Sequence, residues 1–288
     1  MTIINASVSV EEEHAHAHAH DASTTTIKPE AASPLSWKEL IRRGTANVEW
    51  CENVLAKHAH HDWIAEYYNT WSNLVFCIVA LVGLHRVLRR TNTNVVLQNK
   101  TPFVVAEGIL FGVGIGSWFF HSHQSRLAQW SDEIPMSLLL MAQLHCLDGL
   151  HPHASTTFMV HHVFVASFWI LYMYTNIYAI FEHGFTVQII LLTAFSFDIG
   201  RRLHHSQIKW AASLGLLLLA KGIWDIERQR YARGDCHLPL TLWLHPVWHV
   251  GASISHYFAM SNNADLQHVG ALQQQQQQQE KMSVKKKK

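Results

Sequence analysis

The stretch Ser117-Trp118-Phe119-Phe120-His121 ends a long apolar run that begins near residue 103. Asp132 follows shortly after it, and His245-Pro246-Val247-Trp248-His249 lies within a second apolar run far downstream. Ser117 and His121 are four residues apart, as are His245 and His249, so a helix presents each pair on one face. The sequence therefore predicts apolar helices that carry reactive side chains near one end.

Three imidazoles, a carboxylate and a hydroxyl are together the groups that a catalytic zinc site uses. Three protein ligands leave a fourth coordination position open for water, which distinguishes a catalytic zinc from a closed structural one. We expect His121, His245 and His249 to bind zinc, with Asp132 and Ser117 as the catalytic side chains. This set of residues favours a hydrolase whose site is buried in a membrane.

The composition of the chain agrees with a membrane location. Of its 288 residues, 49% are hydrophobic and 15% are charged, and the formal net charge is +1. Low charge with eleven tryptophans is typical of a membrane protein. The near-neutral balance gives no indication of nucleic-acid binding, and no protein partner follows from the sequence.

Both ends of the chain have a composition that is typical of disorder. Residues 1–45 contain acidic and alternating His-Ala sequence, and residues 261–288 contain a glutamine run and four terminal lysines. Such segments cannot bury enough apolar surface to become ordered. We therefore expect a single membrane domain over residues 46–260, between two disordered tails.

Seven apolar stretches within that domain are long enough to cross, or nearly cross, a bilayer, which takes about 20 residues per helix. The fold class that we expect is therefore all-α, a bundle of seven transmembrane helices with short connections. The predicted spans lie near residues 67–89, 103–121, 134–150, 159–180, 184–200, 208–226 and 241–260.

Lysine and arginine in the short connections predict the orientation of this bundle. Arg86, Arg89, Arg201 and Arg202 fall on one side of the predicted helices, and the positive-inside rule assigns that side to the cytosol. The N-terminus is then lumenal and the C-terminus cytosolic. In this topology the five candidate site residues all lie near the lumenal face.

The four cysteines fall into two groups according to their predicted depth in the membrane. Cys77 and Cys146 fall inside predicted helices, whereas Cys51 precedes the first helix and Cys236 lies between the sixth and the seventh. Four cysteines allow three full pairings, and the predicted depth leaves only Cys51 and Cys236 as partners. Because the lumenal side is oxidising, we expect a disulfide between them.

Four motifs occur in a fixed order: Ala65-Glu66-Tyr67-Tyr68-Asn69-Thr70-Trp71-Ser72-Asn73, Gly116-Ser117-Trp118-Phe119-Phe120-His121, Asp132-Glu133-Ile134-Pro135-Met136 and His245-Pro246-Val247-Trp248-His249. Together they closely resemble the alkaline ceramidases over residues 49–258. The resemblance implies hydrolysis of the amide of ceramide to a sphingoid base and a fatty acid. It also implies zinc on the three histidines, Asp132 as the acid and base, and Ser117 as an aid to the oxyanion.

A calcium site before the first helix is also implied by the resemblance. The corresponding ligands here are Glu49, the Trp50 carbonyl, Glu52, Asn53 and Glu66. The family's first Asp is replaced by a glutamate, and the Asn comes one place early. Oxygen ligands of this kind suit calcium, so Ca²⁺ is expected beside Zn²⁺.

Two other functions remain open from the sequence. A seven-helix lipid-sensing receptor of the same superfamily, which includes adiponectin-type receptors, would keep the zinc residues while it signals. The His-Ala repeats raise a metal transporter as a third interpretation, but transporters usually bind their ions near the bilayer midplane. The terminal residues 285–288 resemble a dilysine retrieval signal and indicate the endoplasmic reticulum membrane, with the Golgi as a second address.

Overall fold

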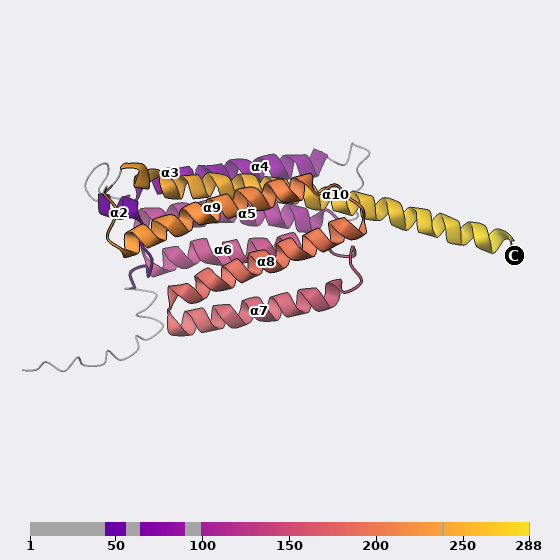
Figure 1. Ribbon diagram of the computed structural model, residues 1–288, viewed down its shortest axis with the longest axis horizontal. Coiled ribbons are helices and arrows are strands. Elements are labelled where there is room, and N and C mark those ends of the chain that lie inside the picture. Colours follow the sequence, from indigo (N-terminus) through magenta and orange to yellow (C-terminus); the bar gives the residue numbers. More distant parts are fainter. Residues whose placement is uncertain (1–43, 56–63, 90–98, 238, 288) are drawn as a thin grey trace, which may run out of the picture. The chain divides into compact units, whose positions relative to one another are not determined.

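Long helices that run side by side make up the described part of the chain (Figure 1). The computed structural model describes residues 44–55, 64–89, 99–237 and 239–287. Within these ranges no strand forms beyond an isolated bridge between Thr45 and Ser125. The predicted N-terminal tail lies almost wholly outside the described residues, and the rest of the structure confirms the expected all-α class.

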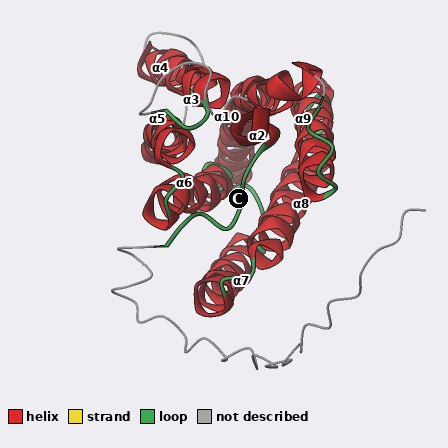
Figure 2. Ribbon diagram, turned by 90° about the vertical axis from the view of Figure 1, so that its left-hand side faces the viewer, coloured by secondary structure: helices red, strands yellow, loops and turns green. Residues whose placement is uncertain are grey.

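Successive long helices run antiparallel because short turns connect them. The elements are α2 (Cys51–Leu55), α3 (Tyr67–Ser72), α4 (Leu74–Arg89), α5 (Thr101–His123), α6 (Arg126–His145), α7 (Ala154–Thr175), α8 (Tyr178–Arg202), α9 (Ile208–Ala232), the 3-10 helix η2 (Pro239–Trp243) and α10 (Leu244–Lys287). Seen end-on from the side of α2, helices α5, α6, α8, α9 and α10 are arranged around the bundle axis (Figure 2).

The turn between α5 and α6 decides where the site forms. Gln124 ends α5 in the left-handed region with a φ of 50°, and its backbone N–H donates to the Phe120 carbonyl. Ser125 then caps α6, because its side chain accepts a hydrogen bond from the Ala128 N–H. This two-residue connection returns the chain at once, so that the end of α5 lies beside the beginning of α6.

Four helices are long and apolar enough to cross a membrane by length and composition: Tyr67–Arg89, Thr101–His123, Ala154–Thr175 and Tyr178–Arg202. The other three predicted spans correspond to α6, α9 and α10. These helices carry more polar side chains, as α6 does at Arg126, Gln129, Asp132 and Glu133. The described residues thus form an all-helical membrane protein with four such helices.

The last helix extends beyond the domain boundary that the sequence predicted at residue 260. α10 continues to Lys287, and Ala264 and Leu266 are buried in the helical bundle. This differs from the disordered tail expected from residue 261. The physical reason is that glutamine and lysine are good helix formers, so a low-complexity run continues a helix whose first turns are already packed.

Candidate metal centre

Three buried histidines from two helices converge at the end of the bundle where α2 lies. His121 comes from the last turn of α5, and His245 and His249 come from the first two turns of α10. Their ligand nitrogens all lie within 4.8 Å of one another, and each residue is at most 3% exposed. The structure therefore contains a buried group of imidazoles that could hold a metal ion.

Two of these imidazoles are oriented by neighbouring oxygens. His121 Nδ1 lies 2.5 Å from Glu66 Oε2, and His249 Nδ1 lies 2.7 Å from the hydroxyl of Ser72. When Nδ1 carries the proton and donates it to such an oxygen, Nε2 is left as a lone pair, which is the state in which histidine binds a metal.

The third imidazole has a carboxylate beside it as well. His245 Nδ1 lies 3.2 Å from Glu227 Oε2, although the angle between them does not make a hydrogen bond. His121 Nε2, which points the other way from Glu66, is buried without any hydrogen-bond partner. A buried nitrogen left in this state is costly, and a metal ion shared with the other two histidines would satisfy it.

The hydroxyl and the carboxylate predicted to be catalytic lie next to these histidines. Ser117 is one turn before His121 and is buried. The Asp132 carboxyl accepts a hydrogen bond from Ser117 and faces His121. Both side chains line a cavity that also reaches His245 and His249, so all five predicted residues are brought together.

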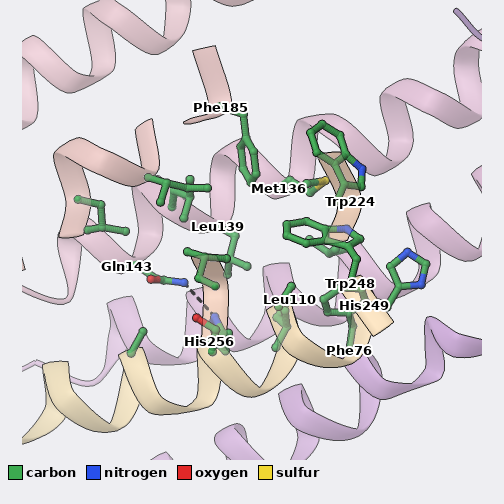
Figure 3. Close-up of a pocket in the computed structure, with 18 of the residues that line it drawn as sticks. Phe76, Leu110, Met136, Leu139, Gln143, Phe185, Trp224, Trp248, His249 and His256 are labelled. Atoms are coloured by element: carbon green, nitrogen blue, oxygen red, sulfur yellow. Dashed lines mark hydrogen bonds between the residues drawn. The ribbon is translucent and has the colours of Figure 1, made fainter. Parts of the chain in front are cut away.

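A mostly apolar cavity leads away from the site between α5, α6, α8, α9 and α10. In Figure 3, His249 lies on one side of it, and Gln143 and His256 lie on the opposite side. Apolar side chains such as those of Leu139 and Phe185 line the space between them. Its shape and lining suit the hydrocarbon chain of a lipid, because pockets of this kind bind apolar ligands and use a few polar groups to orient them.

The family model for ceramidases matches residues 42–287 of this chain. The chain belongs to the ceramidase family. It is similar to an alkaline ceramidase of Arabidopsis thaliana, with 27% identity over 226 residues that cover 75% of this chain and 81% of the relative. It is also similar to an alkaline ceramidase of Saccharomyces cerevisiae, with 26% identity over 261 residues, 80% of this chain and 78% of the relative. The resemblance of the four motifs is thus confirmed.

Several oxygen atoms of the predicted calcium site accept hydrogen bonds from other groups of the protein. Both carboxylate oxygens of Glu52 accept backbone hydrogen bonds at the start of α3, from Tyr68 N at 2.6 Å and from Asn69 N at 2.9 Å. Burial raises the pKa of Glu52 to about 7, although these two hydrogen bonds lower it. Glu52 therefore caps α3, whose first N–H groups would otherwise lack partners.

The other members of that predicted set are engaged in a similar way. Glu49 Oε2 accepts a hydrogen bond from the hydroxyl of Tyr231, and the Trp50 carbonyl accepts one from the Asn53 N–H. Glu66 contacts His121, as described above. Glu66 Oε1, in contrast, is buried without a hydrogen-bond partner. The calcium site therefore stays a prediction.

A disulfide joins the segment before the helices to the loop that leads to α10. Cys51 at the start of α2 is bonded to Cys236, which lies just before η2. Cys77 and Cys146 are free thiols and are buried. The bond ties the backbone that carries Glu52 to the loop that leads to His245, as the sequence predicted.

Two residues of the site were missed from the sequence. Ser72 had no assigned role, although it belongs to one of the four motifs. Glu227 falls just beyond the predicted sixth span and had no assigned role. Glu227 could have been found from its place at the same end of the predicted bundle as the three histidines. A carboxylate that is buried there needs a partner to be stable.

Proposed function

We propose that this protein is a zinc-dependent amidase that hydrolyses ceramide to a sphingoid base and a free fatty acid. Membership of the ceramidase family supports the substrate. The observation that carries the zinc is the buried His121–His245–His249 group, in which His121 Nε2 lacks a partner and each Nδ1 has an oxygen beside it. Metal-binding histidines usually have such outer partners.

When bound, the ion supplies a positive charge that polarises the amide carbonyl and lowers the pKa of a water molecule to about 7. The residues of the chain perform the remaining tasks. Asp132 is placed to accept the proton of the attacking water and to deliver it to the nitrogen of the leaving amine. The Ser117 hydroxyl, which holds Asp132 in the resting site, is placed to donate to the developing oxyanion.

The energetic share of Ser117 follows from similar sites. A single donor to an oxyanion typically contributes about 2.7–4 kcal/mol to stabilisation of the transition state.

The imidazole partners Glu66, Ser72 and Glu227 hold the ligands in one orientation, which avoids reorganisation during the reaction. The apolar cavity excludes water from the lipid chain and aligns the amide with the site.

We further propose seven membrane spans, with the site near the lumenal face and α10 leading to the cytosol. The basic residues Arg86, Arg89, Arg201 and Arg202 all lie at the end of the bundle opposite the histidines, which supports this orientation. The Cys51–Cys236 bond on the side of the histidines also favours an oxidising compartment there. With residues 285–288 in the cytosol, the endoplasmic reticulum membrane, and secondly the Golgi, is the proposed location.

The test is to purify His249→Ala and Asp132→Asn variants with the wild type and to measure zinc content and release of sphingoid base. His249→Ala should lose both the metal and the activity. Asp132→Asn should lose activity but keep its zinc, because the carboxylate is assigned proton transfer. The exposed His183 offers a matched control, and His183→Ala should behave as the wild type.

Full activity and full zinc content in His249→Ala would rule out the metal centre. Loss of zinc in Asp132→Asn would make Asp132 a ligand and would require another proton carrier. A wild type that binds zinc but releases no sphingoid base from any ceramide would favour the receptor over the hydrolase.

A further inference from the structure

The end of the cavity far from His121, His245 and His249 is polar. Gln143, Ser196, Asn262 and Asn263 line it, and each is at most 6% exposed. His256 also lines this end, where its imidazole pairs with the carboxylate of Glu107, which lies outside the lining. Within the described lining, the acidic side chains are those of Asp132 and Glu133 at the catalytic end, and no lysine or arginine takes part. A neutral polar pocket at the end of an apolar cavity is suited to a neutral hydrogen-bonding group.

The hydrogen bonds at this polar end are incomplete. Asn262 Nδ2 donates to Ser196 Oγ over 3.3 Å, and Ser196 Oγ donates to Asn263 Oδ1 over 3.5 Å. Asn263 Nδ2 reaches the Gln143 carbonyl only at 3.5 Å. These distances are at or beyond the usual range for hydrogen bonds. Asn262 Oδ1 has no partner at all although the residue is only 1% exposed.

Such a buried acceptor without a partner is destabilising, so a group that donates to it would bind favourably. A hydroxyl both donates and accepts, so it can donate to Asn262 Oδ1 and accept from a neighbouring amide such as that of Asn263. The charged groups nearest this end, His256 and Glu107, already pair with each other, so a carboxylate or an ammonium would enter without a counter-charge of its own, which burial strongly disfavours. The chemistry of this end therefore selects an alcohol.

The distance between the two ends indicates what carries that alcohol. His249 and Asn263 lie on the same helix, fourteen residues apart, which corresponds to about 21 Å at 1.5 Å per residue. Leu139 and Ala252 are among the apolar residues between them. A fully extended long acyl chain is of this length, so the hydroxyl would be attached to the far end of the chain whose amide lies at the histidines.

We propose that this polar end is a binding site for a terminal hydroxyl group, and that the protein prefers ceramides whose long acyl chain ends in a hydroxyl. The proposal rests on the proposed hydrolase function and deepens it by naming a substrate subclass. Asn262 is the specificity-determining residue, because its Oδ1 is the acceptor without a partner.

The experiment compares kcat/KM for palmitoyl ceramide and its ω-hydroxy counterpart in wild type and Asn262→Leu. We expect the wild type to favour the hydroxylated chain by about tenfold, which corresponds to one hydrogen bond to a buried acceptor. Asn262→Leu, which removes the acceptor at similar volume, should abolish or reverse that preference. Ser261→Ala serves as control, since Ser261 does not line this cavity, and it should keep the preference.

A ceramide with a hexanoyl chain, too short to reach Asn262, separates specificity from catalysis. Ser261→Ala should hydrolyse it as fast as the wild type does, and the rate of Asn262→Leu on this substrate gives the baseline against which its loss of preference is measured. Equal kcat/KM for the two palmitoyl ceramides in the wild type would overturn the proposal, because a site that holds only water does not distinguish them. An unchanged preference in Asn262→Leu would overturn it too.

A measurement without turnover keeps the two proposals apart. The melting temperature of the wild type should rise more with ω-hydroxypalmitate than with palmitate, and this difference should vanish in Asn262→Leu. If no ceramide is hydrolysed but this difference is present, the hydrolase function fails and the hydroxyl site stands. Equal shifts with both acids contradict the hydroxyl site.

Discussion

Gly116→Ala is the substitution with the most direct consequence for the site. Gly116 is next to Ser117 on α5 and faces the α6 backbone at Asp132, so a side chain there pushes the two catalytic residues apart. A Cβ at Gly116 would lie 1.9 Å from the Ser131 carbonyl oxygen and 3.2 Å from the Asp132 backbone nitrogen. The obstacle is backbone, so no side-chain rotation relieves it. Pro135 contributes to this geometry, since it has no N–H to bond the Ser131 carbonyl within α6.

The size of the effect follows from that contact. Ordinary van der Waals contact begins at 3.4 Å, so α5 and α6 must separate by about 1.5 Å, the difference between 3.4 and 1.9 Å. Because Ser117 and Asp132 lie on either side of this contact, their hydrogen bond would be stretched. A misplacement of about 1 Å can cost about a hundredfold in rate, and overpacking costs about 1–3 kcal/mol in stability.

The assay is kcat/KM with ceramide together with the melting temperature, and Gly112→Ala is the matched control. Gly112 lies one turn earlier on α5 and has open space around its Cβ position, so alanine there gains helix propensity without a clash. We expect at least a hundredfold loss of kcat/KM and a lower melting temperature in Gly116→Ala alone. Wild-type activity in Gly116→Ala would refute the close packing of α5 on α6.

Further variants test the surroundings of the centre. Ser72→Ala removes the oxygen beside His249 Nδ1 and should lower zinc affinity about 10- to 100-fold, as competition with a chelator measures; unchanged affinity would exclude this role. Cys51→Ser breaks the bond to Cys236 and should cost about 2–5 kcal/mol, seen as a lower melting temperature that reducing agent does not lower further. Burial raises the pKa of Glu52 from 4.5 to about 7, so folding favours its protonated form. That contribution to stability is lost as pH rises from about 4.5 through 7, and Glu52→Gln should show a flatter pH dependence of melting temperature.

The helices and the site could be predicted to different extents. The positions of α4 and α5 follow from apolar runs, which are unambiguous where nearly every residue is apolar. The start of α8 was placed six residues late, at 184 instead of Tyr178. The start of α6 was placed eight residues late, at 134 instead of Arg126. Its first turns are polar, and their burial depends on partners from distant segments, such as Gln129 with Asn47 and Glu133 with Tyr172.

The candidate site shows the same limit. His121, His245 and His249 could be predicted because spacing and helix direction alone bring them to one end of the bundle. The residues around them could not, since Glu66 was assigned to calcium by the motif while its carboxylate contacts His121. A sequence motif gives the residue type that a position requires, but the rotamer and the partner depend on packing that no local pattern contains.

The order of the ligands along the chain has a consequence for biosynthesis. Two of the three histidines lie on α10, which is synthesised after the other described helices, and their outer partners come from α3 and α9. A nascent chain that has already inserted its first six long helices holds His121 alone and has no competent metal site. Under the proposed mechanism the enzyme therefore stays inert until α10 has been synthesised, and a product truncated before residue 245 would not act on membrane lipid.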